Sequence, residues 1–291
     1  MLLGCHLSIA KGFVGAVRAA EDLGNSALQV FSHNASAWRM RPLRDEDADA
    51  FREACDASQI AYVVIHTTYL LNLASPDEAL YEKSIAALEQ EFERAGRLGA
   101  DALVTHLGAH RGAGTQAGID RIVAALDRVL ASRAVEESSG VLLLLEDTAG
   151  AGTTMGTDPG ELSAIVEALS DARRIGICLD TCHAFAAGLP VHTSDGLEGV
   201  VAALDQRLGI DRLALIHLND SVFPFGSRRD RHAHIGHGHL GEAGIARILN
   251  HPALRDLPFI LETPKEIDGQ PNADAINLAR VRALRASKEA G

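Results

Sequence analysis

The chain has 291 residues, of which 47% are hydrophobic and 23% charged, so it can bury a complete hydrophobic core, and we expect one domain spanning residues 1–291. No apolar run approaches the roughly 20 residues of a membrane span and the first residues lack a secretory signal, so we expect neither a membrane protein nor a secreted one. The formal net charge of −12 argues against a protein that coats nucleic acid, although bound divalent cations would reverse the field at an acidic site.

The cysteines give a clue to the compartment. Cys5, Cys55, Cys178 and Cys182 form no Cys-x-x-Cys pair, which is typical of reduced thiols rather than of a disulfide framework. We therefore expect a cytoplasmic protein.

Short apolar runs alternate with longer amphipathic segments along the whole chain. The apolar runs, predicted to be strands, are Leu3–His6, Ala27–Phe31, Tyr62–His66, Ala102–His106, Val141–Glu146, Ile175–Asp180, Leu213–His217 and Phe259–Glu262. The amphipathic segments, predicted to be helices, are Gly15–Leu23, Asp45–Ser58, Asp77–Leu98, Gln116–Glu137, Pro159–Leu169, Gly196–Leu208, Gly241–Leu249 and Ala273–Lys288.

This order of elements favours one fold over its main alternative. Strands that are apolar on both faces and separated by helices pair in parallel, and eight such units close most naturally into a (β/α)8 TIM barrel, an α/β fold. A doubly wound open sheet is the alternative, but no Gly-x-Gly-x-x-Gly motif follows the first strand. In a TIM barrel the active site lies at the C-terminal ends of the strands.

Side chains that can bind metals occupy the C-terminal ends of seven predicted strands. They are His6, His66, His106, Glu146, Asp180, His217 and Glu262. A single histidine or carboxylate at such a position is commonly structural, but seven at one rim favour a site, and imidazole with carboxylate suits Zn²⁺ and similar divalent ions.

The spacing of these residues suggests how they divide. Glu146, central in strand order, could bridge two ions, with His66 and His106 on one side. The residues expected on the other side are Asp180, His217 and Glu262. Paired ions about 3.5–4 Å apart are suited to phosphoryl transfer.

A third set is expected from a histidine-rich segment. Asp230 and His232 lie two residues apart, on one side of an extended segment, and His183 could complete three ligands for another ion. Asp180 and His183 would point to opposite faces of an extended chain, so they would serve two neighbouring ions; a strand-capping Asp180 and a structural His183 are the alternative. The nearby His234, His237 and His239 could instead belong to a solvated loop.

These residues lie in motifs that resemble the endonuclease IV family over essentially the whole chain. The matching segments are Gly4-Cys5-His6-Leu7-Ser8, His66-Thr67-Thr68-Tyr69-Leu70-Leu71-Asn72-Leu73, Glu146-Asp147-Thr148-Ala149-Gly150, Leu179-Asp180-Thr181-Cys182-His183-Ala184-Phe185-Ala186-Ala187-Gly188, His217-Leu218-Asn219-Asp220-Ser221, Asp230-Arg231-His232-Ala233-His234-Ile235-Gly236 and Glu262-Thr263-Pro264.

The resemblance implies an activity and a cofactor. Members of this family are zinc-dependent apurinic/apyrimidinic endonucleases, which cleave double-stranded DNA 5′ to an abasic site and trim blocked 3′ ends. The family pattern implies three zinc ions per chain. We also expect that Mn²⁺ can occupy some of the positions and that the enzyme is a monomer. The family pattern places one ion on His66, His106 and Glu146, a second on Glu146, Asp180, His217 and Glu262, and a third on His183, Asp230 and His232.

The chain departs from the family pattern where it would touch DNA. Ala35 and Ser36 stand where the family has Pro and Arg before the tryptophan, and Val222 stands where it has Lys. The remaining candidates to stack on DNA are Tyr69 and Trp38, although an aromatic at a barrel rim is as often simple packing. The candidates for phosphate contacts are Arg228, Arg229 and Arg231.

Two other functions remain as alternatives. The quartet Glu146, Asp180, His217 and Glu262 also resembles the single-metal site of sugar isomerases and epimerases of the xylose-isomerase-like barrel group, which do not need the other metal-binding side chains. A non-enzymatic metal-binding or DNA-scaffold protein would not need ligands from six or more strand ends. The excess of potential ligands favours phosphodiester hydrolysis.

Overall fold

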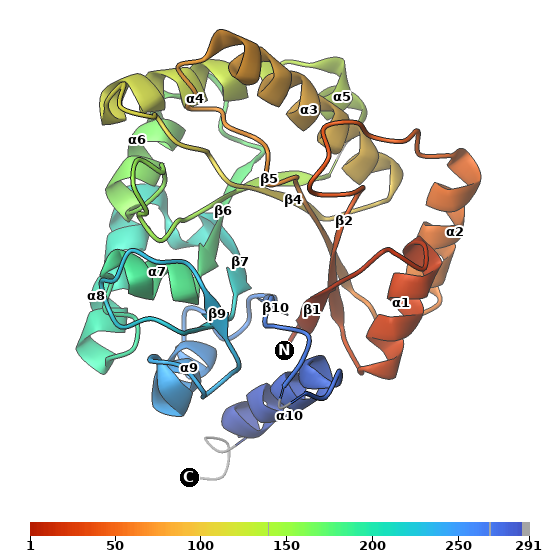
Figure 1. Ribbon diagram of the computed structural model, residues 1–291, viewed down its shortest axis with the longest axis vertical. Helices are drawn as coiled ribbons and strands as arrows, with labels where there is room; N and C mark the ends of the chain where they lie inside the picture. Colours follow the sequence, from red (N-terminus) through yellow and green to blue (C-terminus); the bar gives the residue numbers. More distant parts are fainter. Residues whose placement is uncertain (139, 268, 287–291) are drawn as a thin grey trace.

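A closed barrel of eight parallel strands forms the centre of the protein in the computed structural model, which describes residues 1–138, 140–267 and 269–286 (Figure 1). The strands are β1 (Leu3–Leu7), β2 (Ala27–Phe31), β3 (Tyr62–His66), β4 (Ala102–Thr105), β5 (Leu142–Glu146), β6 (Ile175–Asp180), β7 (Leu213–His217) and β10 (Phe259–Leu261). They follow one another around the barrel, and β10 pairs with β1 to close it. The predicted (β/α)8 barrel is confirmed.

Helices form an outer ring around the strands (Figure 1). They are α1 (Phe13–Asp22), α2 (Asp45–Asp56), α3 (Glu78–Arg97), α4 (Thr115–Leu130), α5 (Arg133–Glu137), α6 (Pro159–Ala168), α7 (Thr181–Ala187), α8 (Ser194–Leu208), α9 (Gly241–Asn250) and α10 (Ala273–Ala286), with a 3₁₀ turn at Ile210–Arg212. Capping side chains fix several starts: Asp77 accepts from Leu80 N, and Asp158 accepts from Gly160 N and Glu161 N.

The structure differs from the sequence prediction in three places, and one prediction extends past the described residues. The helix predicted over Gln116–Glu137 is wrong as one element, because the chain turns extended at Ser132 and divides it into α4 and α5. Helix α7 directly follows β6, whereas the sequence analysis treats the chain from Asp180 to His183 as extended. A two-stranded antiparallel ribbon, β8 (Asp220–Ser221) with β9 (His232–Ala233), was not predicted. The last two residues of the predicted helix Ala273–Lys288 lie outside the described residues.

The barrel interior shows why the strands deliver polar side chains to one end. A small buried cluster fills the middle of the barrel, made of Ala27, Val64, Ala102, Val104, Leu144, Cys178, Leu215 and Ile260. Successive side chains of a strand alternate between faces, so residues two positions further along point into the same space. The positions two residues beyond Val64, Leu144 and Leu215 are His66, Glu146 and His217, which therefore point into the barrel mouth above the apolar layer.

The larger apolar core lies between the barrel and the helices. Its biggest fully buried side chains include Phe51, Phe92, Phe185 and Phe259. Among the described residues, no helix has the length and apolar character that crossing a membrane requires.

The close contact between β1 and β2 gives a test of the packing. A Cβ added at Gly4 would overlap the carbonyl oxygen of Ala27, a backbone atom that cannot move without disturbing the sheet. We expect Gly4→Ala to lower the free energy of unfolding by about 1–3 kcal/mol or more, as overpacking does. The matched control is Gly199→Ala in α8, where an added methyl group meets no described atom and should stabilise the helix by about 0.5–1 kcal/mol. Urea denaturation measures both, and equal stability of the two variants would contradict this packing.

A candidate metal centre at the barrel mouth

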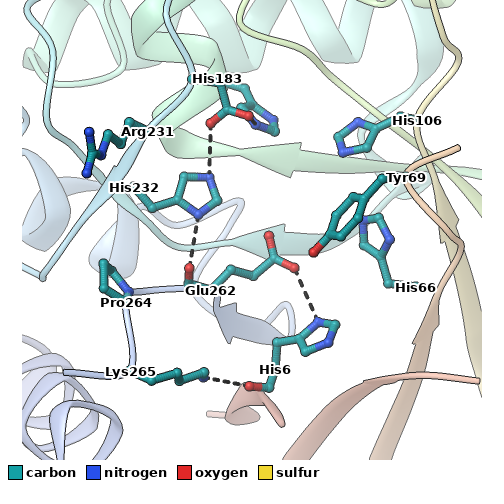
Figure 2. A pocket seen from close by; sticks show the side chains of 11 residues that line it. His6, His66, Tyr69, His106, His183, Arg231, His232, Glu262, Pro264 and Lys265 are labelled. Atoms are coloured by element: carbon teal, nitrogen blue, oxygen red, sulfur yellow. Dashed lines mark hydrogen bonds and ion pairs between the residues drawn. The ribbon is translucent and has the colours of Figure 1, made fainter. Parts of the chain in front are cut away.

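A cavity of about 450 Å³ opens at the C-terminal end of the barrel (Figure 2). Its histidines come from strand ends, from α7 and from the β9 ribbon: His6, His66, His106, His183 and His232. Figure 2 shows Tyr69, His66 and His106 on one side of this cavity, His183 and His232 on another, and the Glu262 carboxylate between them. The positively charged Arg231 and Lys265 also line it.

Glu146 lies at the centre of this arrangement, with no exposed surface. Its Oε2 is 3.1 Å from His66 Nε2 and 3.4 Å from His106 Nε2, and its Oε1 is 2.9 Å from His217 Nδ1. Burial by itself would raise the pKa of Glu146, but the neighbouring imidazoles of His106, His217 and His66 hold it well below its usual value. The side chain is therefore an ionised carboxylate with both oxygens directed at nitrogen atoms.

The potential ligand atoms form three sets, and within each set they lie within 4.8 Å of one another. They are His66, His106 and Glu146; Glu146, Asp180, His217 and Glu262; and His183, Asp230 and His232. These are the groupings expected from the sequence, and Glu146 belongs to two of them. Two further groups that include a cysteine are Glu146, Cys178 and His217, and Asp180, Cys182 and His232.

The hydrogen bonds of the histidines show which nitrogen faces each set. His232 Nδ1 lies 3.1 Å from the carbonyl oxygen of Glu262, which can only accept, so Nδ1 carries the proton. Its Nε2 is buried, finds no hydrogen-bond partner among the described residues, and lies 3.4 Å from Asp180 Oδ2 and 3.5 Å from Asp230 Oδ1. A nitrogen at this position, facing two carboxylate oxygens, suits either a second proton on the ring or a bound cation.

The same geometry recurs at His66 and His183. The Nδ1 atoms of these rings donate to the carbonyl oxygens of Thr67 and Asp147, at 2.8 and 3.0 Å. Their Nε2 atoms face carboxylates, 3.1 Å from Glu146 Oε2 and 3.2 Å from Asp230 Oδ2. Burial would lower the pKa of both histidines, but the facing carboxylates raise it, well above the usual value at His183. The sets thus attract positive charge, and they fit divalent cations that take imidazole and carboxylate ligands.

Asp180 belongs to one set and lies beside another. Its Oδ1 accepts from the backbone N–H groups of Cys182 and His183, at 2.7 and 3.0 Å, and so caps α7. Its Oδ2 accepts from Asn219 Nδ2 at 2.7 Å and remains close to His232. Asp180 and His183 fall into different sets, but the first turn of α7 separates them, rather than the strand alternation assumed from the sequence.

The candidate DNA-contact residues have different environments. Tyr69 is 64% exposed at the edge of the cavity, and its ring packs edge-on against Phe31, with 5.2 Å between centroids. Trp38 is half-buried against the apolar core, and the Lys83 ammonium lies over its ring, 4.4 Å from the centroid. Tyr69 is therefore free to meet a ligand, whereas Trp38 packs within the protein.

The three arginines of the β8–β9 connection are held at the protein surface. The guanidinium of Arg229 lies over the Phe223 ring, 3.6 Å from its centroid, and Arg231 lines the cavity. Arg228 has a positive φ of 53°, and its N–H donates to the carbonyl oxygen of Ala186, which ties the loop to α7. The loop thus holds its positive charges beside the third set.

The remaining histidines of the histidine-rich segment lie outside the ligand sets. His234 Nε2 lies 3.0 Å from the carbonyl oxygen of Glu266, and its Nδ1 lies 3.0 Å from Asn277 Nδ2. His237 is exposed. Within the described ranges, none of His234, His237 and His239 enters a group of potential metal ligands.

Two residues of the site were not identified from the sequence. Lys265 donates to the carbonyl oxygen of His6 at 2.7 Å and pairs with Asp274, which places its charge at the cavity wall. Gln29 is buried inside the barrel and contacts His217, Glu262 and His6. The one signal for Gln29 was a lone polar residue in the apolar run Ala27–Phe31.

Comparisons with known proteins agree with this architecture. A family model described as "Xylose isomerase-like TIM barrel" matches residues 17–285. The chain is 47% identical to the "Probable endonuclease 4" of Methanoculleus marisnigri, over 98% of this chain and 99% of the relative. It is 42% identical to the "Probable endonuclease 4" of Halothermothrix orenii, over 96% of this chain and 99% of the relative.

Solved structures give the same picture. Endonuclease IV from Thermus thermophilus superimposes with a TM-score of 0.85 at 40% identity, covering 99% of this chain and 100% of that one. A D-tagatose 3-epimerase-like protein superimposes with a TM-score of 0.72 at 19% identity, covering 99% and 100%, a likeness of fold alone.

The histidines of the β9 segment allow a test of the ligand sets. We expect His232→Ala to lower the content of bound divalent metal by about one ion per chain, because it removes one of three ligands from the third set. His237→Ala is the matched control, since His237 is exposed and outside every set, and its metal content should equal that of the unmodified protein. Elemental analysis after loading with zinc and desalting measures both. Equal metal loss in the two variants would contradict the assignment.

Proposed function

Because the chain belongs to the endonuclease IV family of xylose isomerase-like TIM barrels, we propose that it is a DNA repair endonuclease. Its reaction would be hydrolysis of the phosphodiester 5′ to an abasic site, leaving a 3′-hydroxyl and a 5′-deoxyribose phosphate, and removal of blocking groups from 3′ ends. The observation that carries the proposal is the presence of three ligand sets, two of which share Glu146, at the mouth of one barrel.

The donor atoms favour a trinuclear zinc centre. His66, His106 and Glu146 would hold one ion, and His183, Asp230 and His232 another, both with the nitrogen-rich ligation common for zinc. The set that includes Asp180 and Glu262 is richer in oxygen and would also accept Mn²⁺. When bound, such ions activate water at neutral pH and stabilise negative charge on the attacked phosphodiester and its leaving oxygen.

The protein's own groups would orient the substrate around this centre. Glu146 belongs to two sets, so its rigid, buried carboxylate would fix their spacing. Arg231 and Lys265 at the cavity wall would meet the phosphates of a bound strand. Arg228 and Arg229 would extend this contact along the backbone, which explains how a chain with a net charge of −12 can bind DNA.

Entry of the scissile phosphodiester into the cavity requires the abasic nucleotide to leave the helix. The cost of unstacking, a few kcal/mol for a normal nucleotide, is lowest where the base is already missing. Tyr69, exposed at the edge of the cavity, would then occupy the gap. Ala35 is buried, with its carbonyl oxygen accepting from the Thr68 hydroxyl, whereas Ser36 is exposed and could carry a longer side chain toward DNA.

The sugar isomerase or epimerase alternative is less well supported. Such an enzyme would use the quartet of Glu146, Asp180, His217 and Glu262 for one ion, which leaves His66, His106 and the third set without a role. The likeness to epimerase structures is at 19% identity, whereas the likeness to endonuclease IV is at 40%. Zinc content separates the alternatives, because about three ions per chain suits the nuclease and one suits the isomerase.

The role of Glu146 in both paired sets is tested by an isosteric change. We expect Glu146→Gln to abolish cleavage of an abasic-site duplex, because the amide removes the negative charge shared by two sets. The matched control is Glu91→Gln, which alters another buried glutamate that pairs with a histidine, His33, away from the cavity. The control should cleave normally. Near-normal turnover by Glu146→Gln, with circular dichroism showing a folded barrel, would rule out the bridged centre.

The role of Tyr69 is tested by binding. We expect Tyr69→Ala to weaken binding to an abasic-site duplex by about 1–3 kcal/mol, roughly 5- to 150-fold, with zinc content unchanged. Tyr69→Phe keeps the ring and should keep the affinity. Ser36→Arg, which restores the family's residue, should tighten binding. Fluorescence anisotropy at moderate salt measures the affinity of all three variants. Wild-type affinity in Tyr69→Ala would contradict a DNA contact and leave Tyr69 with a packing role alone.

A further inference from the structure

Gln29 connects three residues of the site from inside the barrel. It lies at the middle of β2, has no exposed surface, and is the only polar side chain of that strand. Its amide group is 2.8 Å from His217 Nε2, 2.6 Å from a Glu262 carboxylate oxygen and 2.9 Å from His6 Nδ1. Groups from several strands thus meet at one side chain.

The chemistry of these partners determines how the amide is oriented. The Gln29 NH₂ group donates to a Glu262 carboxylate oxygen at 2.6 Å and also faces His6 Nδ1, so the nitrogen end of the amide points to these two residues. The amide oxygen then faces His217 Nε2, which must be the donor. His217 Nδ1 faces Glu146 Oε1, 2.9 Å away, and Glu262 Oε2, 3.4 Å away, where it could offer its lone pair to a bound cation.

His217 differs from His66, His183 and His232 in how it is anchored. His66, His183 and His232 donate to the backbone carbonyl oxygens of Thr67, Asp147 and Glu262, which a side-chain substitution cannot remove. His217 depends on a side chain instead. Its orientation can therefore be changed by a single substitution at position 29.

The same amide also acts on His6. The Gln29 NH₂ group donates to His6 Nδ1, so the proton of this ring is on Nε2. His6 lines the cavity. Its Nε2–H is thereby a hydrogen-bond donor at the wall where a phosphate oxygen would bind.

We propose that Gln29 is a positioning residue that fixes the proton of His217 on Nε2 and so presents Nδ1 as a ligand to the Glu146, Asp180 and Glu262 set. This role rests on the metal centre of the proposed function. It also predicts that the effect of Gln29 passes through its oxygen, because only the oxygen touches His217.

The test compares three variants of the full-length protein loaded with zinc. Gln29→Met keeps the length of the side chain and loses both hydrogen-bonding functions, whereas Gln29→Glu keeps the acceptor for His217 and loses the donor. Asn25→Ala is the matched control, since it removes a buried amide near the opposite end of β2, about 13 Å away at 3.3 Å per residue. Zinc affinity is measured by competition with a chromophoric chelator, and the protonated nitrogen of His217 by ¹⁵N NMR, with His217→Gln identifying its signals.

We expect Gln29→Met to weaken one zinc site by about 10- to 100-fold and to lose the Nε2–H signature of His217, as substitutions of residues that orient metal ligands do. Gln29→Glu should retain the Nε2–H signature, and Asn25→Ala should match the unmodified protein in both measurements. Unchanged zinc affinity and an intact Nε2–H signal in Gln29→Met would overturn the role of Gln29 and leave the metal centre standing. Equal loss in Asn25→Ala would also overturn it. Failure of the unmodified protein to bind zinc would instead reject the metal centre itself, and the role of Gln29 with it.

Discussion

The structure of the site depends on one electrostatic constraint, the burial of the Glu146 carboxylate without exposed surface. A buried charge is costly unless positive groups or hydrogen-bond donors surround it. Here imidazole nitrogens of His66, His106 and His217 lie 2.9 to 3.4 Å from its two oxygens, and their influence keeps its pKa well below the usual value. Divalent cations held by the same groups would meet this need while adding reactivity.

The closed parallel barrel is what brings these groups together. Every strand ends at the same mouth, and alternation along each strand places the polar side chain two residues above an apolar one. Residues distant in sequence therefore become neighbours without any long loop. The third set is added from outside the barrel, where pairing of Ser221 with His232 carries His232 over the mouth toward Asp180 and His183.

Most of the barrel could be predicted because its strands are apolar on both faces and are separated by amphipathic helices. The grouping of the potential ligands at one mouth could be predicted because these residues stand at strand ends or in motifs with a clear family resemblance. The β8–β9 ribbon could not be predicted, because two-residue strands carry no periodic signal and form only through tertiary pairing. Gln29 was missed for a similar reason: its role depends on which side chains of other strands surround it.

The most direct test of the proposed activity uses a duplex with one tetrahydrofuran abasic analogue, which lacks the aldehyde needed for cleavage by elimination. The purified protein should cut 5′ to the analogue and leave a 3′-hydroxyl that a polymerase can extend. Prolonged treatment with chelator should abolish this cleavage, and added zinc should restore it. Absence of cleavage by the zinc-loaded protein, or cleavage that survives removal of all bound metal, would contradict a metal-dependent endonuclease built around Glu146.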